Sequence, residues 1–186
     1  MEHIYTQPQF GEDWFNYSSF YKGIVETFDT ESTFVEVGSW KGKSSSFMIV
    51  EIINSGKDID LYCVDTWEGS LEHQGNGDLV NLYNTFLTNM SPLEEYYFPL
   101  KISSLSAASK FKDKSIDFVY IDASHEYLDV IKDIKSWMPK VKPGGIIAGH
   151  DYANFYGVTQ AVDELISNPI IYYDQTVWSY KIPETV

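Results

Sequence analysis

Short apolar runs alternate with amphipathic stretches from residue 34 to the end of the chain, and the two patterns predict different elements. Apolar, β-rich runs predict strands at 34–38, 61–64, 99–102, 116–121, 144–148, 170–174 and 177–182. Apolar residues at helical spacing predict helices at 44–55, 79–86, 127–138 and 158–166. This order predicts an α/β domain with a mostly parallel sheet and helices on both faces. The last two runs are close enough to form a hairpin, so at least one strand is expected to run antiparallel.

The length of the chain, 186 residues, predicts a single domain over 1–186. Residues 1–30 are polar and aromatic, and we expect one or two short helices there that cover the domain. Residues 68–92 begin with a polar, glycine-bearing stretch around His73 and continue into a predicted helix. We interpret this segment as a lid or an insertion.

Charge and composition restrict the partners. The 13 lysines and arginines against 27 aspartates and glutamates give a formal net charge of −14. This sign repels phosphate backbones and anionic lipid, so neither nucleic acid nor membrane is an expected partner. No apolar run approaches the roughly 20 residues of a membrane span, and residues 1–10 do not resemble a signal peptide. With Cys63 as the only cysteine, these features favour a cytoplasmic protein. The sequence leaves open whether the protein forms a homo-oligomer.

Polar residues follow several predicted strands, at the edge where parallel sheets bind ligands. Glu36 and Gly38 end the first strand, and Gly42 follows before the helix. The G-x-x-x-G spacing is neither the dinucleotide fingerprint nor a P-loop. Glu36 could fix the loop or accept from an ammonium group. Asp65 ends the second strand, where a carboxylate can accept both hydroxyls of a ribose, so together these features predict a nucleoside site.

Two further strands deliver a second set of side chains to the same edge. Asp122 and His125 follow the fourth strand, and His150 and Asp151 follow the fifth. Carboxylate and imidazole groups suit a divalent metal, and His125 could instead be a general base. Asp122 also precedes a helix, so helix capping is an alternative for it.

The motifs resemble those of class I S-adenosylmethionine-dependent methyltransferases from residue 34 to 182, in particular the small-molecule O-methyltransferases of catechol, caffeoyl-coenzyme-A and macrocin type. The segment Glu36-x-Gly38-x-x-x-Gly42-x-Ser44 is similar to their cofactor motif, and Ser104-Leu105-Ser106 resembles their G-x-S segment beside the adenine. Asp122 to Tyr127 resembles the D-x-x-K-x-x-Y segment of metal-dependent members, with His125 in place of lysine. His150-Asp151 stands where those members have Asp-Asn.

The resemblance implies a Rossmann-like sheet of seven strands, with the last antiparallel, and methyl transfer from S-adenosylmethionine to a small molecule, at oxygen. It implies cofactor contacts from Glu36, Gly38, Ser39, Trp40, Gly42, Ser44, Asp65 and Ser106. It implies catalytic roles for His125 and Asp122, and a site for Mg²⁺ or Mn²⁺ at Asp122, His150 and Asp151. An NAD-linked oxidoreductase and a nucleoside-binding module without catalysis stay as alternatives, and the missing G-x-G-x-x-G counts against the first.

Overall fold

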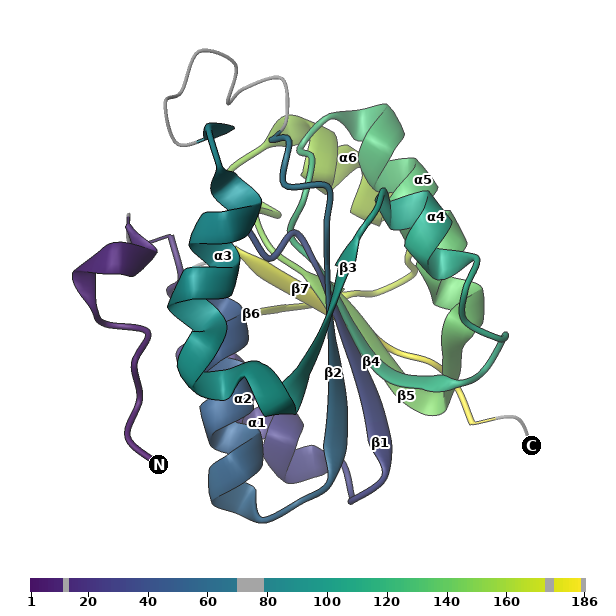
Figure 1. The fold of residues 1–186 in the computed structure, drawn as a ribbon. Helices are drawn as coiled ribbons and strands as arrows, with labels where there is room; N and C mark the ends of the chain where they lie inside the picture. The colour runs from purple at the N-terminus through teal and green to yellow at the C-terminus, as the bar shows by residue number, and fades with distance from the viewer. Residues whose placement is uncertain (12–13, 70–78, 173–175, 185–186) are drawn as a thin grey trace.

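The computed structural model of the protein describes residues 1–11, 14–69, 79–172 and 176–184. Its centre is a seven-stranded sheet in the order β3-β2-β1-β4-β5-β7-β6 (Figure 1). The strands are β1 (Ser32–Val37), β2 (Ile59–Asp65), β3 (Tyr97–Lys101), β4 (Ile116–Ile121), β5 (Val141–Gly149), β6 (Ile170–Tyr172) and β7 (Val177–Lys181). Each boundary lies within three residues of the predicted run.

The strand directions confirm the expected mostly parallel sheet with an antiparallel last strand. Strands β1 to β5 pair in parallel. Strand β7 pairs antiparallel with both β5 and β6, so β6 runs in the same direction as β5. The central strand β4 shows why the apolar runs predicted the strands: only Asp117 among its residues is not buried. A strand covered on both faces must be almost continuously apolar.

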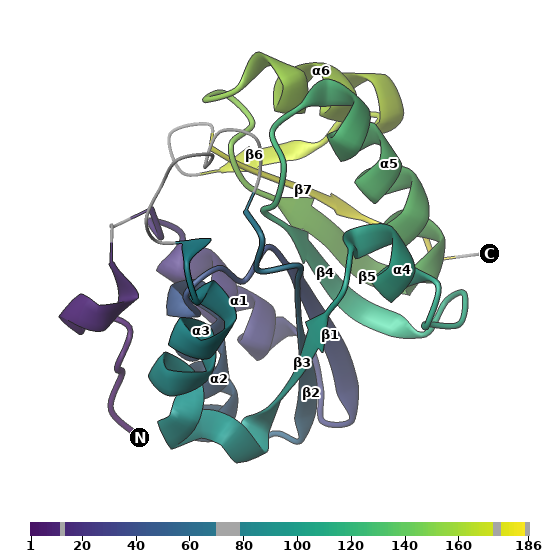
Figure 2. The same ribbon diagram turned by 45° about the horizontal axis from the view of Figure 1, so that its top comes forward.

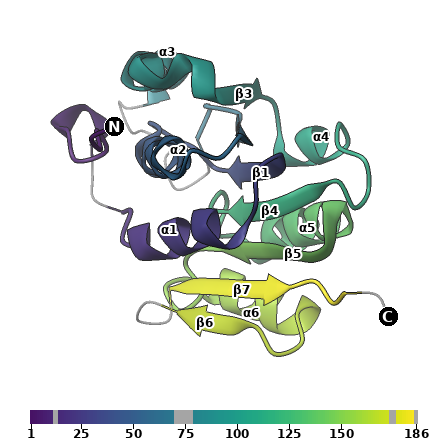
Figure 3. The same cartoon turned by 90° about the horizontal axis from the view of Figure 1, so that it is seen from below.

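Helices cover both faces of the sheet, as Figure 3 shows in a view from below. On one face lie α1 (Ser18–Thr27), α2 (Lys43–Ser55) and α3 (Leu82–Met90), and on the other lie α4 (Ser104–Ala108), α5 (Tyr127–Trp137) and α6 (Tyr156–Leu165). Successive residues of β1 point to opposite faces, so Phe34 joins the core under α1 and α2, and Val35 joins the core under α5 and α6.

Two parts of the fold differ from the sequence-based expectation. Helix α4 was not predicted; it has only five residues, and the Ser103 hydroxyl caps it by accepting from the Ser106 N–H. Helix α3 was interpreted as part of a lid, but Leu82, Phe86 and Met90 are completely buried in the core. Residues 82–92 therefore belong to the helical layer, and the lid interpretation is wrong for them. His73, with the rest of 70–78, lies outside the described residues.

The N-terminal segment lies over the first helical face. It contains a 3-10 turn, η1 (Pro8–Phe10), followed by α1. Phe10, Phe15 and Tyr17 are buried and anchor the segment to the core. None of the helices in the described part of the chain is long and apolar enough to cross a membrane.

Candidate active site

A cavity of about 1080 Å³ opens at the carboxyl edge of the parallel strands, the edge that comes forward in Figure 2. The loops after β1 to β5 line it, and Phe10 and residues 14–17 close one side. Small-molecule sites are usually roughly 300–1,000 Å³. This cavity therefore lies at the upper end of the range for such sites.

The loop between β1 and α2 is fixed by its backbone. Gly38 and Trp40 both have positive φ, at 97° and 48°. A Cβ on Gly38 would lie 1.8 Å from the carbonyl oxygen of Asp122, so only glycine lets the ends of β1 and β4 approach this closely. The backbone of residues 38–40 consequently borders the cavity, together with Ser44 at the start of α2.

Glu36 lies behind this loop rather than in the cavity. Its side chain is 2% exposed, and it accepts hydrogen bonds from the hydroxyls of Tyr21 and Ser39 at 2.9 Å each and from Ser45. Burial raises the pKa of Glu36, and these hydroxyl donors oppose the rise. Of the two roles considered for Glu36, the contacts describe the one that fixes the loop.

Gly42 and Ser106 also lie away from the cavity lining, contrary to the sequence-based expectation. A Cβ on Gly42 would meet Met90 at 2.7 Å, so this glycine makes room for α3 and not for a ligand. The Ser106 hydroxyl accepts from that of Ser103 at 2.9 Å. Ser104 and Leu105 of this segment border the cavity instead, because successive residues of the five-residue helix point in different directions.

Asp65 is the last residue of β2 and borders the cavity. Its two carboxylate oxygens accept the backbone N–H groups of Trp40 at 2.9 Å and Trp67 at 2.7 Å. The Trp67 indole in turn donates to the carbonyl of Trp40 at 2.8 Å. Each carboxylate oxygen can accept a second hydrogen bond. Asp65 thus holds the loop after β1 at the border of the cavity.

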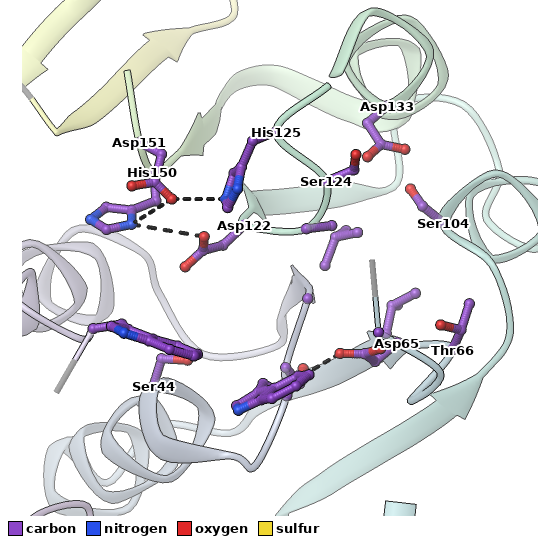
Figure 4. Close-up of a pocket in the computed structure, with 18 of the residues that line it drawn as sticks. Ser44, Asp65, Thr66, Ser104, Asp122, Ser124, His125, Asp133, His150 and Asp151 are labelled. Atoms are coloured by element: carbon purple, nitrogen blue, oxygen red, sulfur yellow. Dashed lines mark hydrogen bonds and ion pairs between the residues drawn. The ribbon is translucent and has the colours of Figure 1, made fainter. Parts of the chain in front are cut away.

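Asp122, His125 and Asp151 come together at the other end of the cavity (Figure 4). Nε2 of His125 lies 2.9 Å from Oδ2 of Asp151. The His125 ring stacks on Phe155, with centroids 3.9 Å apart. Asn154 donates to the other oxygen of Asp151 at 2.8 Å. One ligand atom from each member of the trio lies within 4.8 Å of the others, an arrangement that could hold a metal ion.

His150 lies beside this trio and also contacts Asn16 of the N-terminal segment. Its Nδ1 is 3.3 Å from Asp151 and 3.8 Å from Asp122, and its Nε2 is 3.2 Å from the Asn16 side-chain oxygen. Tyr17 donates to Asp122 at 2.9 Å. Asp122, His125 and Asp151 offer ligand atoms within 4.8 Å of one another. Nδ1 of His150 also lies near both carboxylates, so the metal set of Asp122, His150 and Asp151 stays a prediction.

Burial and the neighbouring charges shift the pKa values of the acids and histidines in this cluster. Burial raises the pKa of Asp122, with Asp151 adding to the rise and His150 opposing it. Burial alone would raise the pKa of Asp151, but hydrogen bonds from His125 and His150 outweigh it and hold that pKa well below its usual range. Burial would lower the pKa of His150, and its bond to Asp151 reverses this. Asp151 is thus the permanently ionised member.

Sequence reasoning missed Asn16, Tyr17 and Asp133 as cavity residues. Asn16 and Tyr17 belong to an aromatic segment that carried no strand or helix period. Asp133 sits within the stripe of α5, where the helical spacing of Val130, Ile134 and Trp137 indicated a buried face. A carboxylate inside such an apolar face is the one signal that could have marked Asp133.

The sheet order, the antiparallel β7 and the cavity across the carboxyl edge define a Rossmann-like methyltransferase fold. Residues 35–152 match the sequence model of a family described as "Methyltransferase domain". The chain belongs to this family, whose fold is that of the S-adenosylmethionine-dependent methyltransferases.

Solved structures share the fold at low identity. The O-methyltransferase NovP superposes with a TM-score of 0.66 and 16% identity, covering 89% of this chain and 79% of NovP. A proposed caffeoyl-CoA O-methyltransferase from Staphylococcus aureus superposes with a TM-score of 0.62 and 16% identity, covering 88% of this chain and 82% of that protein. An rRNA methylase from Streptococcus thermophilus superposes with a TM-score of 0.60 and 13% identity, covering 88% of this chain and 95% of that protein. The likeness is one of fold.

Two curated relatives are similar in sequence. Uncharacterized protein R132 of Acanthamoeba polyphaga mimivirus is 24% identical over 167 residues, which cover 87% of this chain and 72% of the relative. Uncharacterized protein y4gI of Sinorhizobium fredii is 26% identical over 151 residues, 78% of this chain. The chain spans only 16% of the length of y4gI.

Proposed function

We propose that the protein transfers a methyl group from S-adenosylmethionine to a hydroxyl oxygen of a small molecule. The observation that carries this proposal is a single cavity with a carboxylate suited to a ribose, Asp65, on one side and the Asp122–His125–Asp151 cluster on the other (Figure 4). The volume of about 1080 Å³ accommodates a cofactor and an acceptor together.

The chemistry of the first side fits the cofactor. When bound, S-adenosylmethionine supplies a sulfonium methyl group that a nucleophile can displace. Asp65, a carboxylate at the end of β2 that borders the cavity, would accept the ribose hydroxyls. The backbone of Gly38, Ser39 and Trp40, with Ser44, would border the methionine portion. The contribution of these residues is orientation, which brings the nucleophile, the methyl carbon and the sulfur into line.

The acid–histidine cluster would activate the acceptor. Because Nε2 of His125 faces the ionised Asp151 at 2.9 Å, a neutral His125 carries its proton there, and Nδ1 is its basic atom. His125 would take the hydroxyl proton at Nδ1, and Asp151 would stabilise the resulting imidazolium. Asp122, oriented by Tyr17, would hold the acceptor next to His125.

The same cluster also fits a divalent cation. Asp122, His125 and Asp151 offer two carboxylates and one imidazole within a common reach of 4.8 Å. Oxygen ligands favour Mg²⁺, and the histidine moves the preference toward Mn²⁺ or Zn²⁺. These three residues would hold the ion, whose charge would lower the pKa of the acceptor hydroxyl.

Calorimetric titration with S-adenosylmethionine, S-adenosylhomocysteine and NAD tests the cofactor. We expect both sulfur compounds to bind and NAD not to bind. Binding of NAD alone would support the oxidoreductase instead. Incubation with S-adenosylmethionine and a panel of hydroxylated small molecules, with S-adenosylhomocysteine release as the readout, then separates an enzyme from a nucleoside-binding module.

Variants test the acceptor end. His125→Gln and Asp151→Asn are expected to lose turnover and to keep S-adenosylhomocysteine binding. His3→Gln is the matched control, because His3 stacks on Phe47 and pairs with Glu51 away from the cavity. Turnover that survives both active-site variants would contradict the assignment. If a chelator abolishes wild-type turnover, the cation is required; if it does not, His125 acts as the base.

A further inference from the structure

Tyr21 is a buried hydroxyl donor that the proposed chemistry does not use. It lies on α1, in the N-terminal segment, and its side chain is completely buried. The family model matches residues 35–152, so Tyr21 lies outside the matched region. Its hydroxyl nevertheless donates at 2.9 Å to Oε1 of Glu36, a residue of β1 inside that region. The N-terminal segment therefore reaches the strand that carries the loop of residues 38–40.

The Glu36 carboxylate joins three parts of the fold. Its Oε1 accepts from Tyr21 of α1, and its Oε2 accepts from Ser39 of the loop at 2.9 Å and from Ser45 of α2. Because Glu36 is 2% exposed, water is not at hand to replace a donor that is removed. The position of the carboxylate, and through Ser39 that of the loop, then depends on each of these hydroxyls.

Packing fixes the direction from which the Tyr21 hydroxyl acts. The Tyr21 ring meets the rings of Tyr17 and Tyr120 edge to face, with centroids 5.1 and 4.9 Å apart. Helix α1 lies beside α2 on one face of the sheet (Figure 3). Because neighbouring rings hold the Tyr21 ring, a phenylalanine would occupy the same place and lack only the oxygen. Tyr21→Phe thus removes the hydrogen bond and keeps the packing.

The loop that this network reaches borders the cavity. Residues 38–40 line it, and two acids hold them. Glu36 holds the loop at the Ser39 hydroxyl, and Asp65 holds it at the N–H of Trp40, at 2.9 Å. A weakened hold at Ser39 would leave the loop fixed at Trp40 and free to shift at its start.

We propose that Tyr21 is a positioning residue for the cofactor: through Glu36 and Ser39 it sets the part of the loop that faces the amino acid portion of S-adenosylmethionine. The inference rests on the proposed function and adds to it a residue of the N-terminal segment. Tyr21 is not among the described residues that border the cavity, so its effect reaches the ligand only through Glu36. The nucleoside portion, which the proposed function places at Asp65, is affected much less.

The test compares two ligands by calorimetry, S-adenosylhomocysteine and 5′-methylthioadenosine. The second has the same nucleoside and sulfur and lacks the amino acid portion. Tyr21→Phe should weaken S-adenosylhomocysteine binding about threefold to thirtyfold, the range for coupling through a packed network, and methylthioadenosine binding by less than about twofold. Tyr152→Phe is the matched control, because its hydroxyl donates to Asp163 of α6 at 2.7 Å, on the other face of the sheet. It should leave both affinities unchanged.

A double-mutant cycle tests whether Tyr21 acts through Glu36. Glu36→Gln keeps the shape of the side chain and removes its charge. In the Glu36→Gln background, Tyr21→Phe should lower S-adenosylhomocysteine affinity much less than it does in the wild type. Equal losses in the two backgrounds would overturn the inference. If Glu36→Gln does not fold, as judged by thermal unfolding, the comparison of the two ligands in Tyr21→Phe decides the question.

The outcomes separate the two proposals. In folded Tyr21→Phe, equal losses for both ligands, or no loss for either, would overturn the role of Tyr21 and leave the proposed function intact. No binding of S-adenosylhomocysteine by the wild type would overturn the proposed function, and this inference with it.

Discussion

At the scale of single residues, Asp65 has one observed role, in the loop after β1, and one proposed role, at the ribose of the cofactor. It was expected to bind a ribose, and it also holds the backbone of Trp40 and Trp67. Removing its side chain would release the loop whether or not Asp65 binds a ligand. A test of the ribose role therefore needs a shape-conserving variant and a readout specific to the hydroxyls.

Asp65→Asn is expected to weaken S-adenosylhomocysteine binding about tenfold, since a charge-assisted hydrogen bond contributes about 1.5–3 kcal/mol. The wild type should prefer S-adenosylhomocysteine to its 2′-deoxy analogue, and the variant should lose this preference. Asp60→Asn, at an exposed position on the same strand, is the control. An unchanged preference in the folded variant would mean that Asp65 holds only the loop.

Asp133 gives a prediction for stability against pH. Its pKa is raised from 3.8 to about 6 by burial. The folded protein therefore keeps a proton that the unfolded chain has released between about pH 4 and pH 6, and the free energy of unfolding falls as pH rises through this window. At about 1.4 kcal/mol per pH unit, the cost approaches roughly 3 kcal/mol above pH 7.

Asp133→Asn should consequently gain about 2 kcal/mol of stability relative to the wild type between pH 4.5 and pH 8, in urea unfolding of the ligand-free protein. Asp113→Asn is the control and should show no such pH-dependent gain, because Asp113 is exposed and pairs with Lys140 at 2.6 Å away from Asp133. If Asp133→Asn gained or lost the same amount at both pH values, the carboxyl would titrate normally in the folded state.

At the scale of elements, the turn before α2 depends on how α3 packs. Gly42 has a φ of 88°, and a Cβ there would lie 2.7 Å from Sδ and 2.8 Å from Cγ of Met90. Gly56, at the other end of α2, also has positive φ, 71°, but a Cβ there would meet nothing within 4 Å. The two glycines therefore separate backbone strain from steric overlap.

Gly42→Ala is expected to lower the free energy of unfolding more than Gly56→Ala does. The shared cost of positive φ is about 1–2 kcal/mol, and overpacking against the buried Met90 adds about 1–3 kcal/mol. Thermal unfolding of the two variants checks the difference. Equal losses would show that Met90 moves aside freely.

At the scale of the whole molecule, the net charge of −14 is unfavourable for binding nucleic acid, although a solved rRNA methylase shares the fold. Phosphate contacts need lysine and arginine, and 13 of these against 27 acids give a repulsive field at long range. We expect the acceptor to be a small molecule on this ground.

Fluorescence anisotropy with a labelled ribosomal RNA fragment, at physiological salt and saturating S-adenosylhomocysteine, should show no binding up to about 100 μM protein, the weak end of nonspecific affinity. Binding that falls steeply with added salt would reveal a basic patch that net charge conceals, and would favour an RNA acceptor.

The arrangement of strands and helices could be predicted from sequence because it rests on local periods. Strand β4 is apolar apart from Asp117, since both faces are covered, and α5 repeats apolar residues at helical spacing. Helix α4 could not be predicted from sequence, because its five residues are too few to show a helical period. The edge that carries the cavity also followed from sequence, since parallel strands align their carboxyl ends.

What the sequence alone determined, then, is the layer order and the set of polar residues delivered to one edge, because covalent order and side-chain period suffice for both. Only the tertiary structure decided which of them face the cavity. Glu36 points inward to Tyr21 and Ser45, and His150 is held by Asn16, 134 residues away in the chain. Such contacts depend on how distant elements pack, and packing leaves no periodic trace in the sequence.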